Sequence, residues 1–107
     1  MTVLITGPDT DGLGDALSDL GIDVVRVDGV ATRDTIADAG VDTADTLVLT
    51  DMDDASVIPV AREANPDIRV VAYSRDSLPE YARGQADLAV DPDLLAADVV
   101  AEELVGA

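Results

Sequence analysis

The chain has 107 residues and carries a net charge of −17, from 23 acidic and 6 basic residues. Such a charge excludes nucleic-acid binding, which needs a cationic surface. The absence of Cys and His excludes disulfides, thiol and imidazole chemistry and nearly every zinc site. With 48% apolar residues the chain is too hydrophobic for an acidic disordered segment. We expect one cytoplasmic domain over residues 1–107, without membrane insertion because no apolar run approaches 18 residues.

The charged residues have an unusual composition. All six basic residues are Arg, and 19 of the 23 acidic residues are Asp. Carboxylates keep a protein hydrated in concentrated salt, where a short Debye length of about 3 Å at 1 M screens their mutual repulsion. This composition resembles that of proteins from extremely halophilic archaea, so a halophilic archaeal origin is expected.

Short apolar runs alternate with helical patterns along the whole chain. The strands are expected at Val3–Thr6, Val24–Asp28, Thr46–Thr50, Arg69–Ser74 and Leu88–Val90. The helices are expected at Gly12–Leu20, Thr32–Ala39, Asp53–Ala64, Leu78–Ala86 and Pro92–Leu104. Strands and helices that alternate over short links predict a parallel sheet with right-handed crossovers. The expected fold is therefore α/β, with three layers and a five-stranded parallel sheet.

Several residues mark where these helices begin and end. Gly21 is expected to end the first helix and Thr32 to cap the second. Pro59 either kinks the third helix or lies in its first turn, and Pro92 is expected at the first position of the last helix.

The loop after the first strand, Gly7-Pro8-Asp9-Thr10-Asp11-Gly12, has the glycine spacing of a phosphate-binding turn. Gly7 and Gly12 match this pattern, and they also fit the tight turn of any strand–helix junction. Asp9 stands where the middle glycine lets the backbone approach a pyrophosphate, so its side chain adds bulk and a like charge. This carboxylate predicts weak nucleotide binding or none.

Three stretches carry a family resemblance: ADTLVLTDMDD (44–54), NPDIRVVAYSRD (65–76) and ADLAVDPDLLAADVVAEEL (86–104). They resemble the nucleotide-binding domain of potassium-transport regulators of the Trk/RCK type. The resemblance implies a Rossmann-like fold that binds NAD or ATP and dimerises. About twenty residues that follow the second strand in that family are missing here. Their loss leaves the flavodoxin-like strand order 2-1-3-4-5. The residues implied as cofactor-binding are Gly7, Asp9, Gly12, Asp28, Thr50, Asp51 and Arg75.

The chain is also similar to short haloarchaeal proteins sometimes labelled "CTP synthetase". Its residues contradict that activity, because a phosphate-loop Lys and a glutaminase Cys–His pair are both absent. We therefore expect no enzyme.

The segment Thr50-Asp51-Met52-Asp53-Asp54 suggests two further kinds of site. A calcium loop fails, because Ser56 and Arg62 stand where Gly and Glu are required. In a response-regulator receiver, Asp51 would be the phosphoacceptor and Ser74 the switch hydroxyl. The acidic pair after the first strand is displaced in that case, and Asp91 stands where a Lys is expected.

The loops at the carboxyl edge of the predicted sheet carry many acidic residues: Asp9, Asp11, Asp28, Asp51, Asp53, Asp54, Asp76, Asp91 and Asp93. This rim attracts Mg²⁺ or K⁺, or it is only an acidic surface, and any two of its carboxylates can pair by chance. Only Arg33 and Arg75 lie where they could offset it, and Arg75 pairs with Asp76 or Asp51 if it has no ligand.

Two functions from different classes fit these observations. The favoured one is a non-catalytic regulatory or interaction module, homodimeric through the face Leu94–Leu104, which docks on a larger enzyme or transporter. The alternative is a small-ligand sensor that binds NAD, ATP or CTP with Mg²⁺.

Overall fold

The computed structural model describes residues 1–27 and 29–106. Its five strands form one sheet in the order β2-β1-β3-β4-β5, and each neighbouring pair is parallel. The strands are β1 (Thr2–Thr6), β2 (Asp23–Val27), β3 (Thr46–Leu49), β4 (Arg69–Tyr73) and β5 (Leu88–Val90). The expected α/β class and the flavodoxin-like strand order are confirmed.

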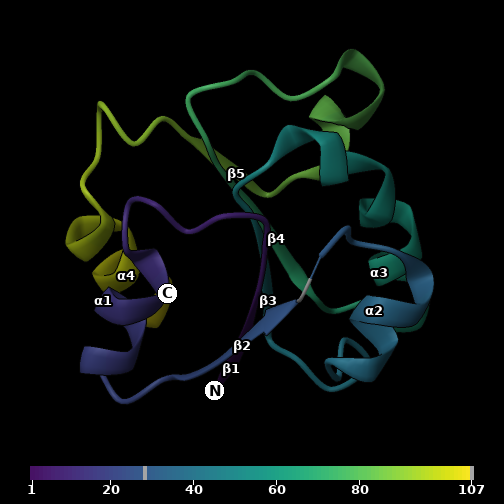
Figure 1. Ribbon diagram of the computed structural model, residues 1–107, viewed down its shortest axis with the longest axis horizontal. Helices are drawn as coiled ribbons and strands as arrows, with labels where there is room; N and C mark the ends of the chain where they lie inside the picture. The colour runs from purple at the N-terminus through teal and green to yellow at the C-terminus, as the bar shows by residue number, and fades with distance from the viewer. Residues whose placement is uncertain (28, 107) are drawn as a thin grey trace.

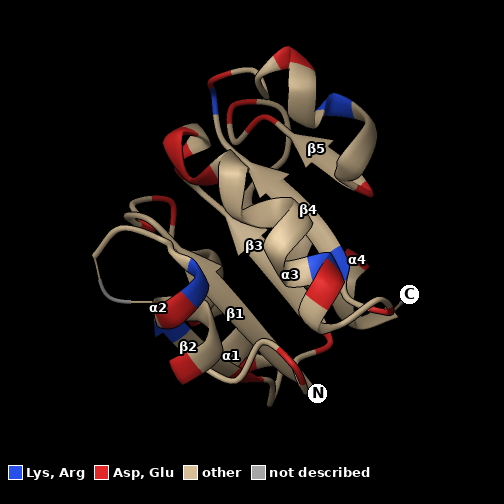
Figure 2. Cartoon of the chain, turned by 90° about the vertical axis from the view of Figure 1, so that its right-hand side faces the viewer, with Lys and Arg blue, Asp and Glu red and all other residues tan. Residues whose placement is uncertain are grey.

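Helices cover both faces of the sheet and make three layers (Figure 1). Helices α1 (Leu13–Asp19) and α4 (Ala97–Gly106) lie on one face, whereas α2 (Arg33–Asp38) and α3 (Ile58–Ala64) lie on the other. Successive side chains of a strand point to opposite faces, so Leu4 of β1 joins one core and its neighbours join the other. Burial on both faces explains why β3 is apolar almost throughout, and the charged residues lie mainly on the surrounding loops and helices (Figure 2).

Two expected helices are wholly or partly 3₁₀ helices in the structure. Residues 53–64 do not form one helix, because the 3₁₀ helix η1 (Met52–Val57) precedes α3 and Pro59 lies in the first turn of α3. Proline is tolerated there, since its missing N–H would have no partner in a first turn. The helix expected at residues 78–86 is the 3₁₀ helix η2 (Glu80–Gln85).

The last helix begins later than expected. It starts at Ala97 rather than at Pro92, and residues 92–95 form turns in which the Leu94 and Leu95 N–H groups donate to the Asp91 carbonyl.

Two expected boundaries are confirmed. The Thr32 hydroxyl accepts a hydrogen bond from the Thr35 N–H at 3.2 Å and caps α2, and Gly21 has φ +82° just after α1. Asp28, the expected end of the second strand, lies outside the described residues. Within the described residues, no helix has the length and apolar character needed to span a bilayer.

Candidate functional site at the carboxyl edge of the sheet

The Asp9 carboxylate binds the start of α1. It accepts hydrogen bonds from the N–H groups of Leu13 at 3.0 Å and Gly14 at 2.7 Å, and from Arg26 Nη1 at 2.9 Å. Its side chain is only 5% exposed. Asp9 thus supplies, from within the chain, the anion that a phosphate supplies at the helix N-terminus of a nucleotide-binding turn. The positive end of α1 is occupied.

Gly14 and Arg26 complete this arrangement, and the sequence did not identify them as site residues. A Cβ on Gly14 would lie 2.9 Å from Asp9 Oδ2 and would clash with the Arg26 guanidinium, so a side chain at this position would displace the ion pair. Arg26 comes from β2, which pairs with β1 in register. Once the strand order is known, Arg26 is the nearest cation at that edge, but no local motif marks it.

Gly7, Thr50 and Asp51 are brought together, as expected for residues at the ends of neighbouring strands. Gly7 has φ +80°, and a Cβ there would lie 2.7 Å from Thr50 Oγ1 and 2.8 Å from Asp51 Cβ. Thr50 Oγ1 donates to the Thr6 carbonyl at 2.7 Å. These contacts join the ends of β1 and β3, so they give Gly7 and Thr50 a packing role.

Asp51 directly follows Thr50 at the end of β3 and caps η1. Its Oδ1 accepts a hydrogen bond from the Asp53 N–H at 2.9 Å. Asp54 is 6% exposed, and its Oδ1 accepts from the Ala31 N–H at 3.2 Å. A cavity of about 570 Å³ opens between the loops that follow β1, β2 and β3, with Asp9, Asp51, Asp53 and Asp54 in its wall.

Arg75 lies apart from this cavity and links three loops. Its Nη1 and Nη2 donate to the Asp11 carboxylate at 3.1 and 3.0 Å, and its Nε donates to Asp93 at 2.9 Å. The hydrogen bonds to Asp11 and then to Asp93 raise the pKa of Arg75 above its usual value. The expected pairing with Asp76 or Asp51 is wrong, because the guanidinium points toward the loops that follow β1 and β5.

The remaining expected residues are Gly12, Asp28 and Arg33. Gly12 has φ +78° before α1, and a Cβ there would have no atom within 4 Å, so its conformation alone calls for glycine. Asp28 lies outside the described residues. Arg33 makes an exposed ion pair with Glu63 at 3.8 Å and does not offset the acidic rim. Among residues 1–27 and 29–106, no group of three or more acidic side chains is arranged to hold a metal ion.

A family model matches residues 3–104 of the chain and is described as a family of unknown function, DUF7126. The chain belongs to this family. No curated protein matches it in sequence. The match to DUF7126 covers nearly all of the chain, including the carboxyl-edge loops described above.

Solved structures with the same fold include three bacterial proteins. HP1043, an orphan response regulator of H. pylori, is 16% identical with a TM-score of 0.77, over 99% of this chain and 94% of that one. A putative pilus assembly protein (cpaE) from Burkholderia thailandensis is 18% identical with a TM-score of 0.70, over 99% and 96%. A response regulator from Burkholderia pseudomallei with a phosphorylated aspartic acid is 16% identical with a TM-score of 0.64, over 98% and 71%.

These similarities correct the expected family. The chain is not a reduced Trk/RCK-type domain or a "CTP synthetase" relative, because the matching structures include response regulators and the matching family is DUF7126. The nucleotide sensor that depended on the Trk/RCK resemblance falls with it, in agreement with an Asp9 carboxylate that fills the start of α1. The expected halophilic archaeal origin also finds no support in these comparisons. At 16–18% identity the similarity shows a shared fold alone.

Proposed function

We propose that residues 1–107 form a single receiver-like signalling domain that acts in the cytoplasm by binding protein and performs no catalysis. The observation that carries this proposal is an apolar surface along β5 and α4. A cavity of about 280 Å³ there is lined by Leu88, Val90, Leu95, Val99, Val100 and Glu103. Leu94, Leu95 and Val99 are 80%, 43% and 45% exposed beside it. Clustered apolar exposure of this kind is typical of an interaction surface.

A second copy of the chain is the proposed occupant of this face. β5 is an edge strand and α4 packs beside it, so a two-fold axis would place the same apolar residues against each other. Asp98, Glu102 and Glu103 of α4 would then approach their own copies, with no basic residue on α4 to offset them. Association should therefore strengthen as salt screens this repulsion.

Sedimentation equilibrium at about 0.1 and 2 M KCl tests the dimer. Wild type should shift toward dimer in the higher salt, whereas Val99→Glu should remain monomeric. Val30→Glu is the matched control, because Val30 is 73% exposed and belongs to the loop between β2 and α2 at the other edge of the sheet. A monomer in both salts at high micromolar concentration would overturn the dimer, as would a Val99→Glu variant that associates like wild type.

Aspartyl phosphorylation at Asp51 is the second candidate. It is favoured by the position of Asp51 after β3, with Ser74 after the neighbouring β4, as expected of a receiver. Two features oppose it. Gly7 and Pro8 follow β1 in place of an acidic pair, and Asp91 after β5 puts a negative charge where a Lys would stabilise the phosphoryl group.

Intact-mass spectrometry after incubation with acetyl phosphate and Mg²⁺ separates the two candidates. We expect no phosphorylated species from wild type. A species that carries one phosphoryl group in wild type and in Asp53→Asn, but not in Asp51→Asn, would establish phosphorylation at Asp51.

A further inference from the structure

The apolar face proposed for dimerisation includes a segment outside the helices and strands, residues 91–95. This segment carries Leu94, which is 80% exposed, and Leu95, which lines the cavity beside β5 and α4. Its internal bonds are local: the Leu94 and Leu95 N–H groups donate to the Asp91 carbonyl at 2.9 and 3.1 Å, and the Asp93 N–H donates to Asp91 Oδ1 at 2.8 Å. Local turns fix the shape of the segment, but its position against the sheet depends on bonds from other elements.

Two side chains at and just after the end of β4 hold this segment from outside. The Tyr73 hydroxyl donates to the Leu95 carbonyl at 2.9 Å, and Arg75 Nε donates to Asp93 Oδ1 at 2.9 Å. Leu94 lies between the two bonded residues. Tyr73 is 2% exposed, and β4 is paired on both sides, by β3 and β5, so the two bonds tie the segment to the interior of the sheet.

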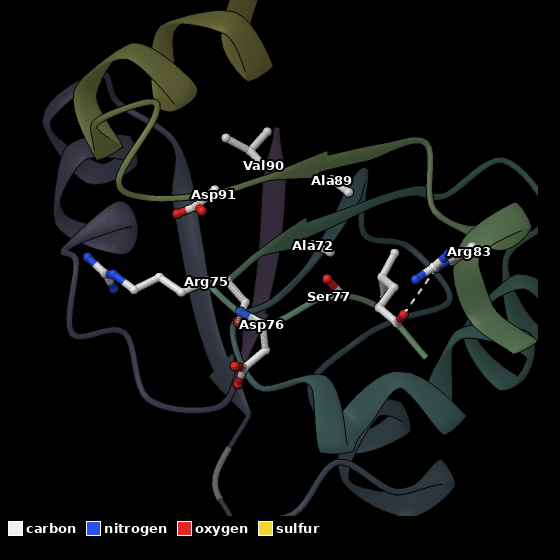
Figure 3. Close-up of a pocket in the computed structure, with 10 residues that line it drawn as sticks. Ala72, Arg75, Asp76, Ser77, Arg83, Ala89, Val90 and Asp91 are labelled. Atoms are coloured by element: carbon white, nitrogen blue, oxygen red, sulfur yellow. Dashed lines mark hydrogen bonds between the residues drawn. The ribbon is translucent and has the colours of Figure 1, made fainter. Parts of the chain in front are cut away.

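Arg75 also connects the segment to the loop that follows β1. Its Nη1 and Nη2 donate to the Asp11 carboxylate at 3.1 and 3.0 Å. Figure 3, a view of the cavity between β4 and β5, shows the Arg75 side chain extending away from Ser77 and Arg83. A bidentate pair fixes the orientation of a guanidinium, so Asp11 aims Nε at Asp93. Without Arg75, the Asp11 and Asp93 carboxylates would repel each other and push the two loops apart.

We propose that Arg75 is a positioning residue for dimerisation, although it lies outside the apolar face. The Asp11–Arg75–Asp93 bridge holds Leu94 and Leu95 where they contact the second copy. This inference rests on the proposed dimer and names what regulates it, because the loop after β1 acts on the apolar face through Arg75. The same loop borders the cavity of about 570 Å³, so a change in the loop reaches the dimer face through this bridge.

The sign of a charge effect distinguishes this bridge from general electrostatics. Neutralising an acid on a protein of net charge −17 lowers the repulsion between two copies, so it should favour the dimer. The bridge predicts the opposite for Asp11→Asn, which removes the charge that orients Arg75. Asp38→Asn is the matched control, because Asp38 is exposed at the end of α2, on the other face of the sheet, and forms no ion pair among the described residues.

Sedimentation equilibrium in about 2 M KCl measures these effects on the dimer Kd. Arg75→Gln should raise the Kd about fivefold, the equivalent of ~1 kcal/mol, and Arg75→Lys should raise it less, since an ammonium keeps the charge but not the bidentate geometry. Arg33→Gln removes the same charge from an exposed pair with Glu63 on the other face and should change the Kd by less than about twofold. Asp11→Asn should raise the Kd about twofold, whereas Asp38→Asn should lower it.

Amide hydrogen exchange locates the effect in the monomeric Val99→Glu background. The Leu94 and Leu95 N–H groups are bonded within the segment, so their exchange rates report its opening. Adding Arg75→Gln should speed both rates about fivefold and leave the amides of β3 unchanged. A general loss of stability would instead speed exchange at β3 as well.

Three results would overturn the bridge: a Kd for Arg75→Gln that matches that of Arg33→Gln, an Asp11→Asn variant that favours the dimer as Asp38→Asn does, or unchanged exchange at Leu94 and Leu95. In a wild type that dimerises, these results leave the proposed function standing. A wild type that stays monomeric overturns the dimer itself, and with it the role proposed for Arg75.

Discussion

Asp9 has a structural task that is measurable at the level of one residue. Its buried carboxylate joins two N–H groups of α1 to Arg26 of β2. Asp9→Asn would turn part of this acceptor into a donor that faces other donors. We expect the free energy of unfolding to fall by about 1–3 kcal/mol, as measured by urea denaturation.

Asp15→Asn is the matched control for charge. Asp15 lies on α1, and its Oδ1 is 3.6 Å from Arg26 Nη2, but its side chain is 89% exposed. Exposed pairs contribute little, so its loss should change stability by less than about 0.5 kcal/mol. Equal effects of the two substitutions would mean that Asp9 acts only as a surface charge.

Substitutions at Gly7 and Gly12 distinguish two reasons why a position requires glycine: its backbone conformation and the space around its Cα. Both have positive φ, which costs a residue with a Cβ about 1–2 kcal/mol. Gly7→Ala also places a Cβ against Thr50 and the Asp51 backbone, whereas Gly12→Ala places it in open space. Gly7→Ala should therefore be the more destabilising by about 1–3 kcal/mol in the same denaturation assay. Equal losses would show that the ends of β1 and β3 can separate at little cost.

The sequence allowed the candidate residues to be found but not their partners. Gly7, Thr50 and Asp51 follow strands that alternation reveals, so their proximity could be predicted. The bond from Asp9 to Arg26 spans 17 positions and that from Arg75 to Asp11 spans 64, and no local pattern encodes either. The sequence suggested that the Asp9 carboxylate disfavours a phosphate, but its hydrogen bonds to the start of α1 become visible only in the fold.

At the scale of elements, Tyr73 fastens the end of β4 to the segment that leads into α4. Its hydroxyl donates to the Leu95 carbonyl at 2.9 Å. Burial, and then the Asp11 charge, raise the pKa of Tyr73 above 10.0, with Arg75 opposing them. A raised pKa in the folded state means that this contribution is full below about pH 10 and is lost as pH rises through the folded value.

Stability measured by urea denaturation should therefore fall as the pH rises above about 10. The chain has no Lys or Cys, so no amine or thiol side chain titrates in the same range. Tyr73→Phe should flatten the alkaline decline and lower stability at pH 7 by about 1 kcal/mol. Tyr81→Phe, at a position that is 62% exposed, should keep the decline. A decline that persists unchanged in Tyr73→Phe would contradict this assignment.

Element boundaries were predictable where capping or period fixes them. The Thr32 cap and the five strands follow from side-chain chemistry and burial, both visible in the sequence. η1 and η2 have apolar residues at spacings that also suit an α-helix, so the sequence did not distinguish the two. The late start of α4 depends on turns that bond to the Asp91 carbonyl, and that bonding becomes visible only in the fold.

For the whole molecule, the excess of carboxylates has few internal partners. Four of the six Arg residues form ion pairs among the described residues: Arg26, Arg33, Arg62 and Arg75. Most of the −17 charge is therefore unpaired on a body with principal extents of 29 × 28 × 25 Å. At 0.1 M salt the Debye length is about 10 Å, so carboxylates that share so small a surface repel one another.

Added salt should therefore stabilise the fold. Between about 0.1 and 1 M KCl the Debye length falls from about 10 to 3 Å, and the carboxylates cease to repel one another. We expect the thermal midpoint, followed by circular dichroism, to rise steeply over this range, and a further rise to 2 M to be small. The physical reason is electrostatic, so it applies whatever the source of the protein.

Two comparisons separate screening from general salt effects. Sucrose stabilises proteins by exclusion from their surface without screening charge, so at equal osmolality it should raise the midpoint less than KCl does. Neutralising exposed acids that form no ion pair among the described residues, for example with Asp19→Asn and Asp67→Asn together, should reduce the dependence on KCl. A midpoint that does not change between 0.1 and 2 M KCl would mean that the folded state tolerates its charge without screening. The predicted salt dependence of dimerisation through β5 and α4 would then lose its physical basis.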